Sequence, residues 1–336
     1  MLDTTNAKKT VWVVSDGIPG HFNQSKGVLF ALERLYTLDV HWLELKLIKR
    51  WLRRPLGWIL NHGLLPLGVM SFFYDNFTLP QVKPDIVIGA GGNSSFAVTW
   101  IARSYQAKSI FCGSLRKLNP ELFDAVLVLE PDLPPPFISL TISPMALDQQ
   151  KLEDLASEWR GTRTVPLYTM LVGGDGAGVQ YEAEDWYVLA NAMNQIAKQQ
   201  NIRWLISTSR RTGAQAEKFL KDNLLADVIE DAVWWSEKPR SILHTYLAVS
   251  EGIFCGIDSM SMIMESLASR RKLIVYKPKQ TQPDERFSNI LNRLEENNLL
   301  RCMVLEELQG TDGFEQMKTL EYDAIEKLAQ LLKERL

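Results

Sequence analysis

Short apolar runs alternate with longer amphipathic stretches along most of the chain. Several of these runs lead into Gly, Asp or Ser, and the stretch that follows usually has the spacing of a helix with one apolar face. The runs are Val11–Val14, Val40–Leu45, Ile86–Ile88, Ser109–Cys112, Ala125–Leu129, Leu167–Val172, Trp204–Ser207, Leu247–Ile253 and Leu273–Tyr276. This alternation predicts βα units around parallel sheets, and so an α/β fold.

The length of 336 residues favours two domains, because one hydrophobic core usually serves about 150 residues. Prolines gather in Pro131–Pro136, and a polar helical stretch, Asp148–Arg160, follows. Proline neither donates to a sheet nor continues a helix, so we predict a linker here, with the boundary near residue 147. We expect two Rossmann-like domains facing a cleft, over residues 8–147 and 148–336, and the amphipathic terminal helix within 322–336 can pack back on the first.

Composition narrows the classes of function. Hydrophobic residues make up 46% and charged residues 23%, as in ordinary folded proteins. The net charge of -3 lacks the basic excess that would neutralise a phosphate backbone, which disfavours nucleic acid as a partner.

The same sequence indicates a compartment. Its three cysteines have no C-x-x-C spacing, which is typical of a reducing environment. The polar stretch Met1–Thr10 has no apolar secretory core, and no apolar run approaches the ~18 residues that span a bilayer. We therefore expect a cytoplasmic protein.

One segment, residues 47–79, departs from the βα pattern by placing basic residues beside large apolar ones. It contains Lys49, Arg50, Arg53 and Arg54, and Trp51, Trp58, Phe72 and Phe73 among other apolar residues. Such a segment can lie in a membrane interface, with the cations on anionic head groups and the rings at the acyl boundary. It can equally be a pair of core-packing helices that begin at Pro55 and Pro66, with the arginines in solvent.

The turns after the strands are the candidate sites, because ligands of doubly wound sheets bind at the carboxyl ends of strands. After the first strand, Gly17, Pro19 and Gly20 shape a tight turn. Asp16, His21, Asn23 and Gln24 surround that turn with polar groups. We interpret Asp16 and His21 as catalytic candidates and Gly17, Gly20, Asn23 and Gln24 as an acceptor loop. The alternative is a capped helix start with no ligand.

A second turn of the first half carries Gly91, Gly92, Asn93 and Ser94 before an expected helix, Phe96–Ser104. Glycines allow a ligand to approach the backbone closely, and we assign these four residues to the same acceptor or cleft loop. The spacing matches neither a G-x-G-x-x-G fingerprint with its acidic partner nor a P-loop. Dinucleotides and ATP are therefore disfavoured as ligands.

Three turns of the second half are predicted to bind a nucleotide sugar. They carry Gly173 and Gly174; Ser209, Arg210 and Arg211; and Asp258, Ser259, Ser261 and Met262 before a helix with Glu265. The arginine fork suits diphosphate oxygens, a helix start with serines suits phosphate, and Glu265 suits ribose hydroxyls. Helix capping and a solvated carboxylate are the alternatives.

Motifs typical of metal-dependent and serine-hydrolase chemistry are absent from the sequence. The sequence has no H-E-x-x-H, no G-x-S-x-G and no D-x-D element. We therefore expect no metal and no cofactor, with the nucleotide sugar as a substrate whose leaving charge is met by arginine and a helix dipole.

These motifs resemble the mitochondrial fission Elm-type family. The matching elements are Asp16-Gly17-x-Pro19-Gly20-His21-x-Asn23-Gln24, Gly173-Gly174, Ser209-Arg210-Arg211-Thr212 and Asp258-Ser259-x-Ser261-Met262-x-x-Glu265. The resemblance implies a GT-B-like fold. A looser similarity to the lipid-linked peptidoglycan N-acetylglucosaminyltransferase and to lipid A disaccharide synthase implies the nucleotide sugar on the second domain and the acceptor on the first.

The hypothesis that follows is metal-independent glycosyl transfer to a lipid-linked or cell-surface glycan acceptor, on the inner face of the cell membrane. His21 or Asp16 would remove the acceptor proton. The alternatives are a nucleotide-sugar 2-epimerase and a non-catalytic scaffold or membrane-associated factor with the same fold.

Overall fold

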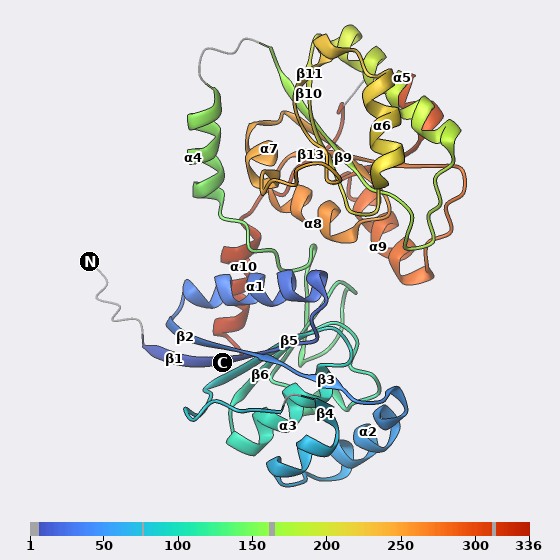
Figure 1. Ribbon diagram of the computed structural model, residues 1–336. Coiled ribbons are helices and arrows are strands. Elements are labelled where there is room, and N and C mark those ends of the chain that lie inside the picture. The colour runs from blue at the N-terminus through green and yellow to red at the C-terminus, as the bar shows by residue number, and fades with distance from the viewer. Residues whose placement is uncertain (1–6, 76, 161–164, 311–313) are drawn as a thin grey trace, which may run out of the picture. The chain divides into compact units, whose positions relative to one another are not determined.

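A computed structural model describes residues 7–75, 77–160, 165–310 and 314–336 of the chain (Figure 1). The chain forms two compact units. Unit 1 consists of Met1–Ala146 together with Tyr322–Leu336, and unit 2 of Leu147–Glu321.

Unit 1 contains a six-stranded parallel sheet with the order β2-β1-β5-β6-β7-β8. Its strands are β1 (Lys8–Ser15), β2 (Thr37–Glu44), β5 (Ile86–Ala90), β6 (Lys108–Cys112), β7 (Ala125–Val128) and β8 (Phe137–Ser139). The central strand β5 is buried along its whole length. Strands covered on both faces are apolar throughout, which explains the uninterrupted apolar runs of the sequence.

Helices cover both faces of this sheet. In β1, Val11 and Val13 pack into one core with α1 (Pro19–Glu33) and α10 (Ala324–Lys333), because successive side chains of a strand point to opposite faces. Trp12 and Val14 pack into the other core, with α2 (Arg53–His62) and α3 (Ser95–Tyr105). Short elements complete the unit: β3 (Lys46–Leu47), η1 (Arg50–Leu52), η2 (Leu67–Phe72), β4 (Tyr74–Asp75) and η3 (Pro120–Leu122).

Unit 2 repeats the architecture, with the parallel order β11-β10-β9-β12-β13-β14. Its strands are β9 (Leu167–Val172), β10 (Arg203–Thr208), β11 (Ile229–Val233), β12 (Gly252–Gly256), β13 (Lys272–Lys277) and β14 (Arg301–Val304). Its helical elements are α4 (Gln149–Arg160), α5 (Ala183–Gln200), α6 (Gly213–Asn223), η4 (Ala226–Val228), α7 (Leu243–Val249), α8 (Met260–Ala268), α9 (Glu285–Glu296) and η5 (Leu305–Gly310). One core joins α5, α6 and η5 to the sheet.

Each sheet has one point at which the direction of strand addition reverses. In unit 1 the chain adds β2 beside β1 and later places β5 on the other side of β1. In unit 2 it adds β10 and β11 beside β9 and later places β12 on the other side. Doubly wound sheets bind ligands at such points, so the turns after β1, β5, β9 and β12 gain weight as site candidates.

The α/β prediction with parallel sheets is confirmed, with some local corrections. Leu247–Ile253 is not a strand: its first part ends α7, and β12 begins at Gly252. Strands β8, β11 and β14 were not predicted. Pro131–Pro136 lies between β7 and β8 inside unit 1 and so is not a linker.

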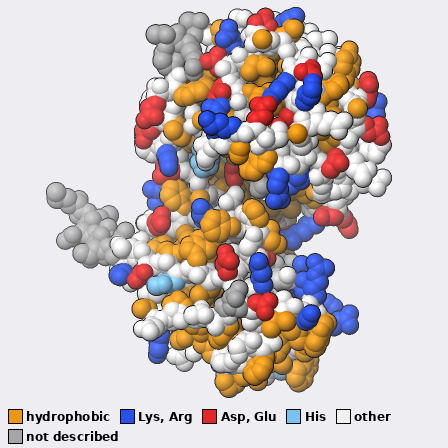
Figure 2. Space-filling view, viewed as in Figure 1, with side chains coloured by type: hydrophobic (Ala, Val, Ile, Leu, Met, Phe, Trp, Pro, Cys, Tyr) orange, Lys and Arg blue, Asp and Glu red, His pale blue; other side chains and the backbone are white. Residues whose placement is uncertain are grey.

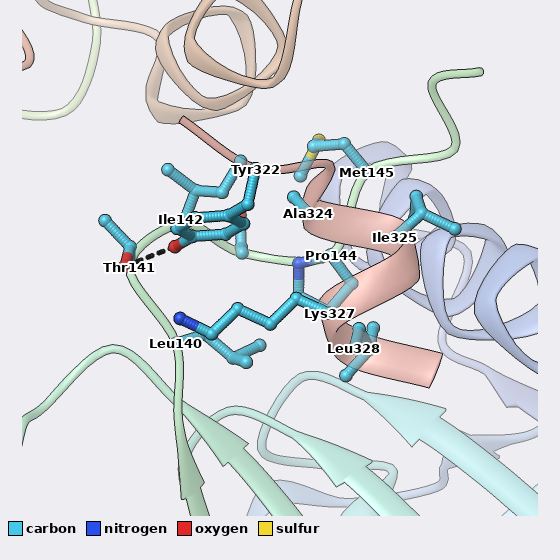
Figure 3. Close-up of a pocket in the computed structure, with 11 residues that line it drawn as sticks. Leu140, Thr141, Ile142, Pro144, Met145, Tyr322, Ala324, Ile325, Lys327 and Leu328 are labelled. Carbon is cyan, nitrogen blue, oxygen red and sulfur yellow. Dashed lines mark hydrogen bonds between the residues drawn. The ribbon is translucent and has the colours of Figure 1, made fainter. Parts of the chain in front are cut away.

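The last helix completes unit 1. The predicted limits counted Tyr322–Leu336 with the second domain, whereas these residues belong to unit 1, where α10 packs against α1. Tyr322 Oη also donates a hydrogen bond of 2.7 Å to Thr141 Oγ1 (Figure 3).

Candidate functional site

The turn after β1 brings His21 onto Asp16 in unit 1. His21 Nδ1 lies 3.0 Å from Asp16 Oδ1 and 3.0 Å from Asp16 Oδ2. Gly17 allows the turn with its left-handed φ of 77°, and Pro19 occupies the first turn of α1, where its missing N–H costs nothing. The two catalytic candidates therefore form one dyad.

The hydrogen bond between His21 and Asp16 has a defined donor. Burial acts to raise the pKa of Asp16, but the hydrogen bond and charge of His21 and the backbone N–H of Ile18 outweigh it and lower the pKa. An ionised Asp16 only accepts hydrogen bonds, so Nδ1 of His21 is the donor. Nε2 is then the ring nitrogen that can take up a proton.

Gly91 makes room for this dyad. A Cβ at Gly91 would lie 2.1 Å from His21 Nδ1, and its φ is 84°. At Gly92 a Cβ would lie 2.3 Å from Arg116 Nε, so the Arg116 side chain lies over this glycine.

The other predicted residues of unit 1 fall into two groups: some hold the turns in shape, and others have polar atoms that could contact a ligand. Ser94 Oγ is buried and donates to the carbonyls of Ala90 and Gly91, so it holds the turn. Asn93 Oδ1 is buried and has no hydrogen-bond partner within the described residues. Gly20, Asn23 and Gln24 lie half-buried in the first turns of α1.

In unit 2 the three predicted turns contact one another. A Cβ at Gly173 would lie 1.7 Å from Asp258 Oδ1, and one at Gly174 would lie 2.1 Å from the carbonyl oxygen of Arg211. Thr212 Oγ1 donates to the carbonyls of Val172 and Gly173 and accepts from Ser209 N. The turns after β9, β10 and β12 are thus one packed assembly.

Arg211 and Asp258 form an ion pair at the centre of this assembly. Arg211 Nε and Nη2 lie 3.1 and 2.5 Å from Asp258 Oδ2, and the side chain of Asp258 is fully buried. Burial raises the pKa of Asp258, and the pair with Arg211 offsets part of that increase. The fork of Arg211, a predicted diphosphate ligand, is therefore directed at Asp258.

Arg210, the other predicted diphosphate ligand, differs from its neighbour. Its side chain is exposed and has no ion-pair partner in the part of the chain that the structure describes. An exposed guanidinium next to a packed turn can bind an anion without first breaking another contact.

Helix α8 begins directly after β12, at the same edge of the sheet as the packed turns. The side chain of Ser259 makes no capping hydrogen bond to the helix, and Ser259 Oγ lies 3.4 Å from Ser261 Oγ. Met262 is half-buried in the first turn. Burial raises the pKa of Glu265 to about 7. The carboxyl edge of the unit 2 sheet therefore combines the N–H groups at the start of α8, the cation Arg210 and the carboxyl of Glu265, whose charge changes near neutral pH.

Two participants were given no role in the site from the sequence, although Thr212 stands in the matching motif. Thr212 pins two turns together, and Arg116 covers Gly92. Arg116 could have been found, since it follows a predicted strand in a Gly-containing turn, whereas the role of Thr212 depends on strand order.

Two hollows among the described residues lie away from these turns. A cavity of about 20 Å³ between segment 140–145 and α10 has room for little more than one water molecule (Figure 3). A hollow of about 260 Å³ in unit 2 is lined by Leu300 and Arg301, where β14 begins, and so lies at the amino edge of the sheet.

Two further features are absent from the described residues: a cluster of metal ligands and a membrane-spanning helix. Among them, no three His, Cys, Asp or Glu side chains gather as metal ligands would. None of the helices in this part of the chain is both long and apolar enough to cross a membrane.

A family model described as "Mitochondrial fission ELM1" matches residues 19–336. The curated proteins contain no match.

Solved structures show where the same fold occurs. The UDP-GlcNAc 2-epimerase from Neisseria meningitidis bound to UDP-GlcNAc has a TM-score of 0.56 at 12% identity, over 97% of this chain and 98% of that one. The UDP-GlcNAc 2-epimerase from Methanocaldococcus jannaschii has a TM-score of 0.55 at 12% identity, over 97% and 99%. The calicheamicin glycosyltransferase CalG4 has a TM-score of 0.51 at 12% identity, over 98% and 94%. The predicted GT-B-like pair of Rossmann-like units is confirmed.

Proposed function

The chain belongs to the mitochondrial fission ELM1 family, and from this premise we propose that it transfers a sugar from a nucleotide sugar, held by unit 2, to an acceptor held by unit 1. The observation that supports the proposal is the convergence of the turns after β9, β10 and β12 at the strand-order reversal of unit 2. Structures of the same fold include a glycosyltransferase and an enzyme bound to UDP-GlcNAc.

The donor is proposed to bind at the start of α8. Its diphosphate lies against the helix N–H groups at Ser259 and Ser261 and takes the exposed fork of Arg210. Glu265 accepts the ribose hydroxyls. In this proposal Arg211 and Asp258 hold the three turns in place, and the arginine and helix dipole meet the leaving charge without metal or cofactor.

The acceptor is proposed to lose its proton to His21 Nε2. Asp16 fixes the ring through Nδ1 and stabilises the imidazolium that forms, so it orients the base. The acceptor hydroxyl lies near the turn of Gly91, Gly92 and Asn93. We propose a lipid-linked or cell-surface glycan as the acceptor and the inner face of the cell membrane as the place of reaction.

A 2-epimerase is the second candidate, because two structures with this fold are UDP-GlcNAc 2-epimerases. The two activities differ in what they need. An epimerase changes UDP-GlcNAc without an acceptor, whereas a transferase releases UDP only when an acceptor is present; chromatography of the products separates them. A scaffold without activity would show neither change.

Nucleotide binding tests the donor site. We expect Arg210→Ala to weaken UDP affinity and to change uridine affinity little, while Glu265→Gln weakens both. A hydrogen bond to a charged group contributes about 1.5–3 kcal/mol, so each loss is about tenfold to a hundredfold by calorimetry. Lys198→Ala, which removes an exposed cation at the end of α5, is the matched control and leaves both affinities unchanged.

Substitutions in unit 1 test the division of roles. Asp16→Asn and His21→Ala should leave UDP affinity unchanged and reduce turnover. If they abolish UDP binding while Glu265→Gln has no effect, the assignment of donor and acceptor to the two units is wrong.

A further inference from the structure

Cations gather in two segments of unit 1 that contain no acidic residue. Residues 46–74 include Lys46, Lys49, Arg50, Arg53 and Arg54 but no Asp or Glu. The turn 113–119, after β6, adds Arg116 and Lys117 and also has no acidic residue. We call Arg50, Arg53 and Arg116 the cation cluster.

The fold brings these two segments together. Asn61 of α2 donates through Nδ2 to the carbonyl of Lys117 at 2.9 Å and accepts from Asn119 N at 2.8 Å. Arg116 has a left-handed φ of 51° and Lys117 one of 71°. Non-glycine residues adopt this conformation only where the surroundings hold them in it. The turn thus presents Arg116 to Gly92 in a fixed shape.

The cluster is electrostatically uncompensated. Burial and the charges of Arg116 and Arg50 lower the pKa of Arg53. Within the described residues, none of the three has an ion-pair partner, and Arg53 Nε is inaccessible to solvent without a hydrogen bond. Asn93 Oδ1, on the same turn as Gly92, is also buried without a partner. Like charges gathered in this way favour binding of an anion.

We propose that Arg50, Arg53 and Arg116 form a binding site for a phosphate group of the acceptor, next to the His21–Asp16 dyad. Guanidinium forks bind phosphate oxygens in pairs, and one or two phosphates balance several cations better than a lone carboxylate does. The Arg116 side chain lies over Gly92, and the adjacent Gly91 lies against His21, so a phosphate bound by Arg116 lies close to the proposed base. The phosphate site itself is argued from the cation cluster. Only the statement that the bound molecule is the acceptor rests on the proposed function.

Calorimetry with inorganic pyrophosphate at low salt tests the site. The wild type should bind, and Arg116→Gln and Arg53→Gln should each weaken binding by about tenfold. Lys83→Gln removes an exposed cation of the same unit outside the cluster and should leave affinity within twofold, or about 0.4 kcal/mol. All variants should melt like the wild type and keep the same UDP affinity.

Vesicles of anionic phospholipid distinguish the source of the phosphate. If pyrophosphate displaces the protein from vesicles and Arg116→Gln prevents vesicle binding, the site accepts a lipid head group. If vesicle binding is indifferent to both, the site accepts a water-soluble phosphorylated acceptor.

Three results would overturn the proposal: no pyrophosphate binding, equal loss in Lys83→Gln, or binding that Arg210→Ala removes and Arg116→Gln keeps. Failure of the proposed function would give a different result. UDP would then not bind, while pyrophosphate binding would still be weakened by Arg116→Gln.

Discussion

Gly91 and Gly173 have equivalent roles at the strand-order reversals of the two units. Each lies where a Cβ would overlap a polar side chain: His21 Nδ1 at 2.1 Å for Gly91 and Asp258 Oδ1 at 1.7 Å for Gly173. In both places the missing side chain lets a charged or titratable group sit against the end of a strand. The glycines therefore determine where the polar chemistry is placed.

Single residues also show what sequence could predict. The sequence selected Asp16 and His21 from their turn, and the structure places them in contact. It could not separate Arg210 from Arg211, because adjacent residues in a turn share composition and spacing. Only the order β10-β9-β12 brings Arg211 to Asp258 and leaves Arg210 exposed.

Glu265 gives a pH dependence that can be measured. Because burial raises its pKa to about 7, a growing share of the carboxyl becomes ionised between pH 6 and pH 8. The ionised form is the stronger acceptor for ribose hydroxyls. We therefore expect UDP and uridine affinity to rise with pH across this range, as measured by calorimetry.

Glu265→Gln is the control for that titration, since the amide keeps the shape and does not ionise. Its affinity should be flat between pH 6 and pH 8. A wild-type affinity that falls with rising pH would contradict the role of Glu265 as a ribose acceptor.

At the scale of elements, residues 47–79 combine buried and exposed large apolar side chains. Leu56, Leu60 and Met70 are fully buried in the core with α3. Trp51, Trp58 and Phe72 remain 69%, 66% and 76% exposed. Figure 2 shows hydrophobic side chains gathered beside Lys and Arg at the α2 end of unit 1. The buried face anchors the segment, as in the core-packing interpretation. Contact of the exposed face with an anionic membrane surface stays a prediction.

Sedimentation with anionic vesicles tests this surface. We expect the protein to bind at low salt and less at high salt, because salt screens charges beyond a Debye length of about 10 Å at 0.1 M. The double change Trp51→Gln, Trp58→Gln should reduce binding strongly. Trp235→Gln, which alters a tryptophan of unit 2 that is 45% exposed, should not.

If the wild type does not bind anionic vesicles at any ionic strength, the proposed reaction at the membrane is wrong. Equal loss in Trp235→Gln would show that the exposed face of η1 and α2 has no special part in binding.

Element prediction failed where periodicity is uninformative. Residues 246–249 are buried at every position, and a short apolar run of this kind fits a buried helix as well as a buried strand. Strand β11 is only half-buried at four positions and so lacks an apolar run. Most predicted strands that succeeded, such as β5 and β7, are buried along their whole length, whereas β2 was predicted although it is mostly half-buried.

At the scale of the whole molecule, the chain leaves unit 1 after Ala146 and returns at Tyr322. Ile325, Leu328 and Leu332 of α10 are buried in the core that α1 shares with β1. The last helix is thus a structural part of the unit that begins the chain, and a truncated chain would expose this core.

Leu332→Ala tests that dependence. Removing a fully buried leucine leaves a cavity and destabilises a domain by about 2–5 kcal/mol. Because two units need not unfold together, hydrogen exchange followed by mass spectrometry is the suitable measurement. We expect faster exchange in Lys8–Ser15 of unit 1 and unchanged exchange in Leu167–Val172 of unit 2. Lys333→Ala, at an exposed neighbouring position, should change neither. If Leu332→Ala instead accelerates exchange equally in both strands, the two units do not unfold independently.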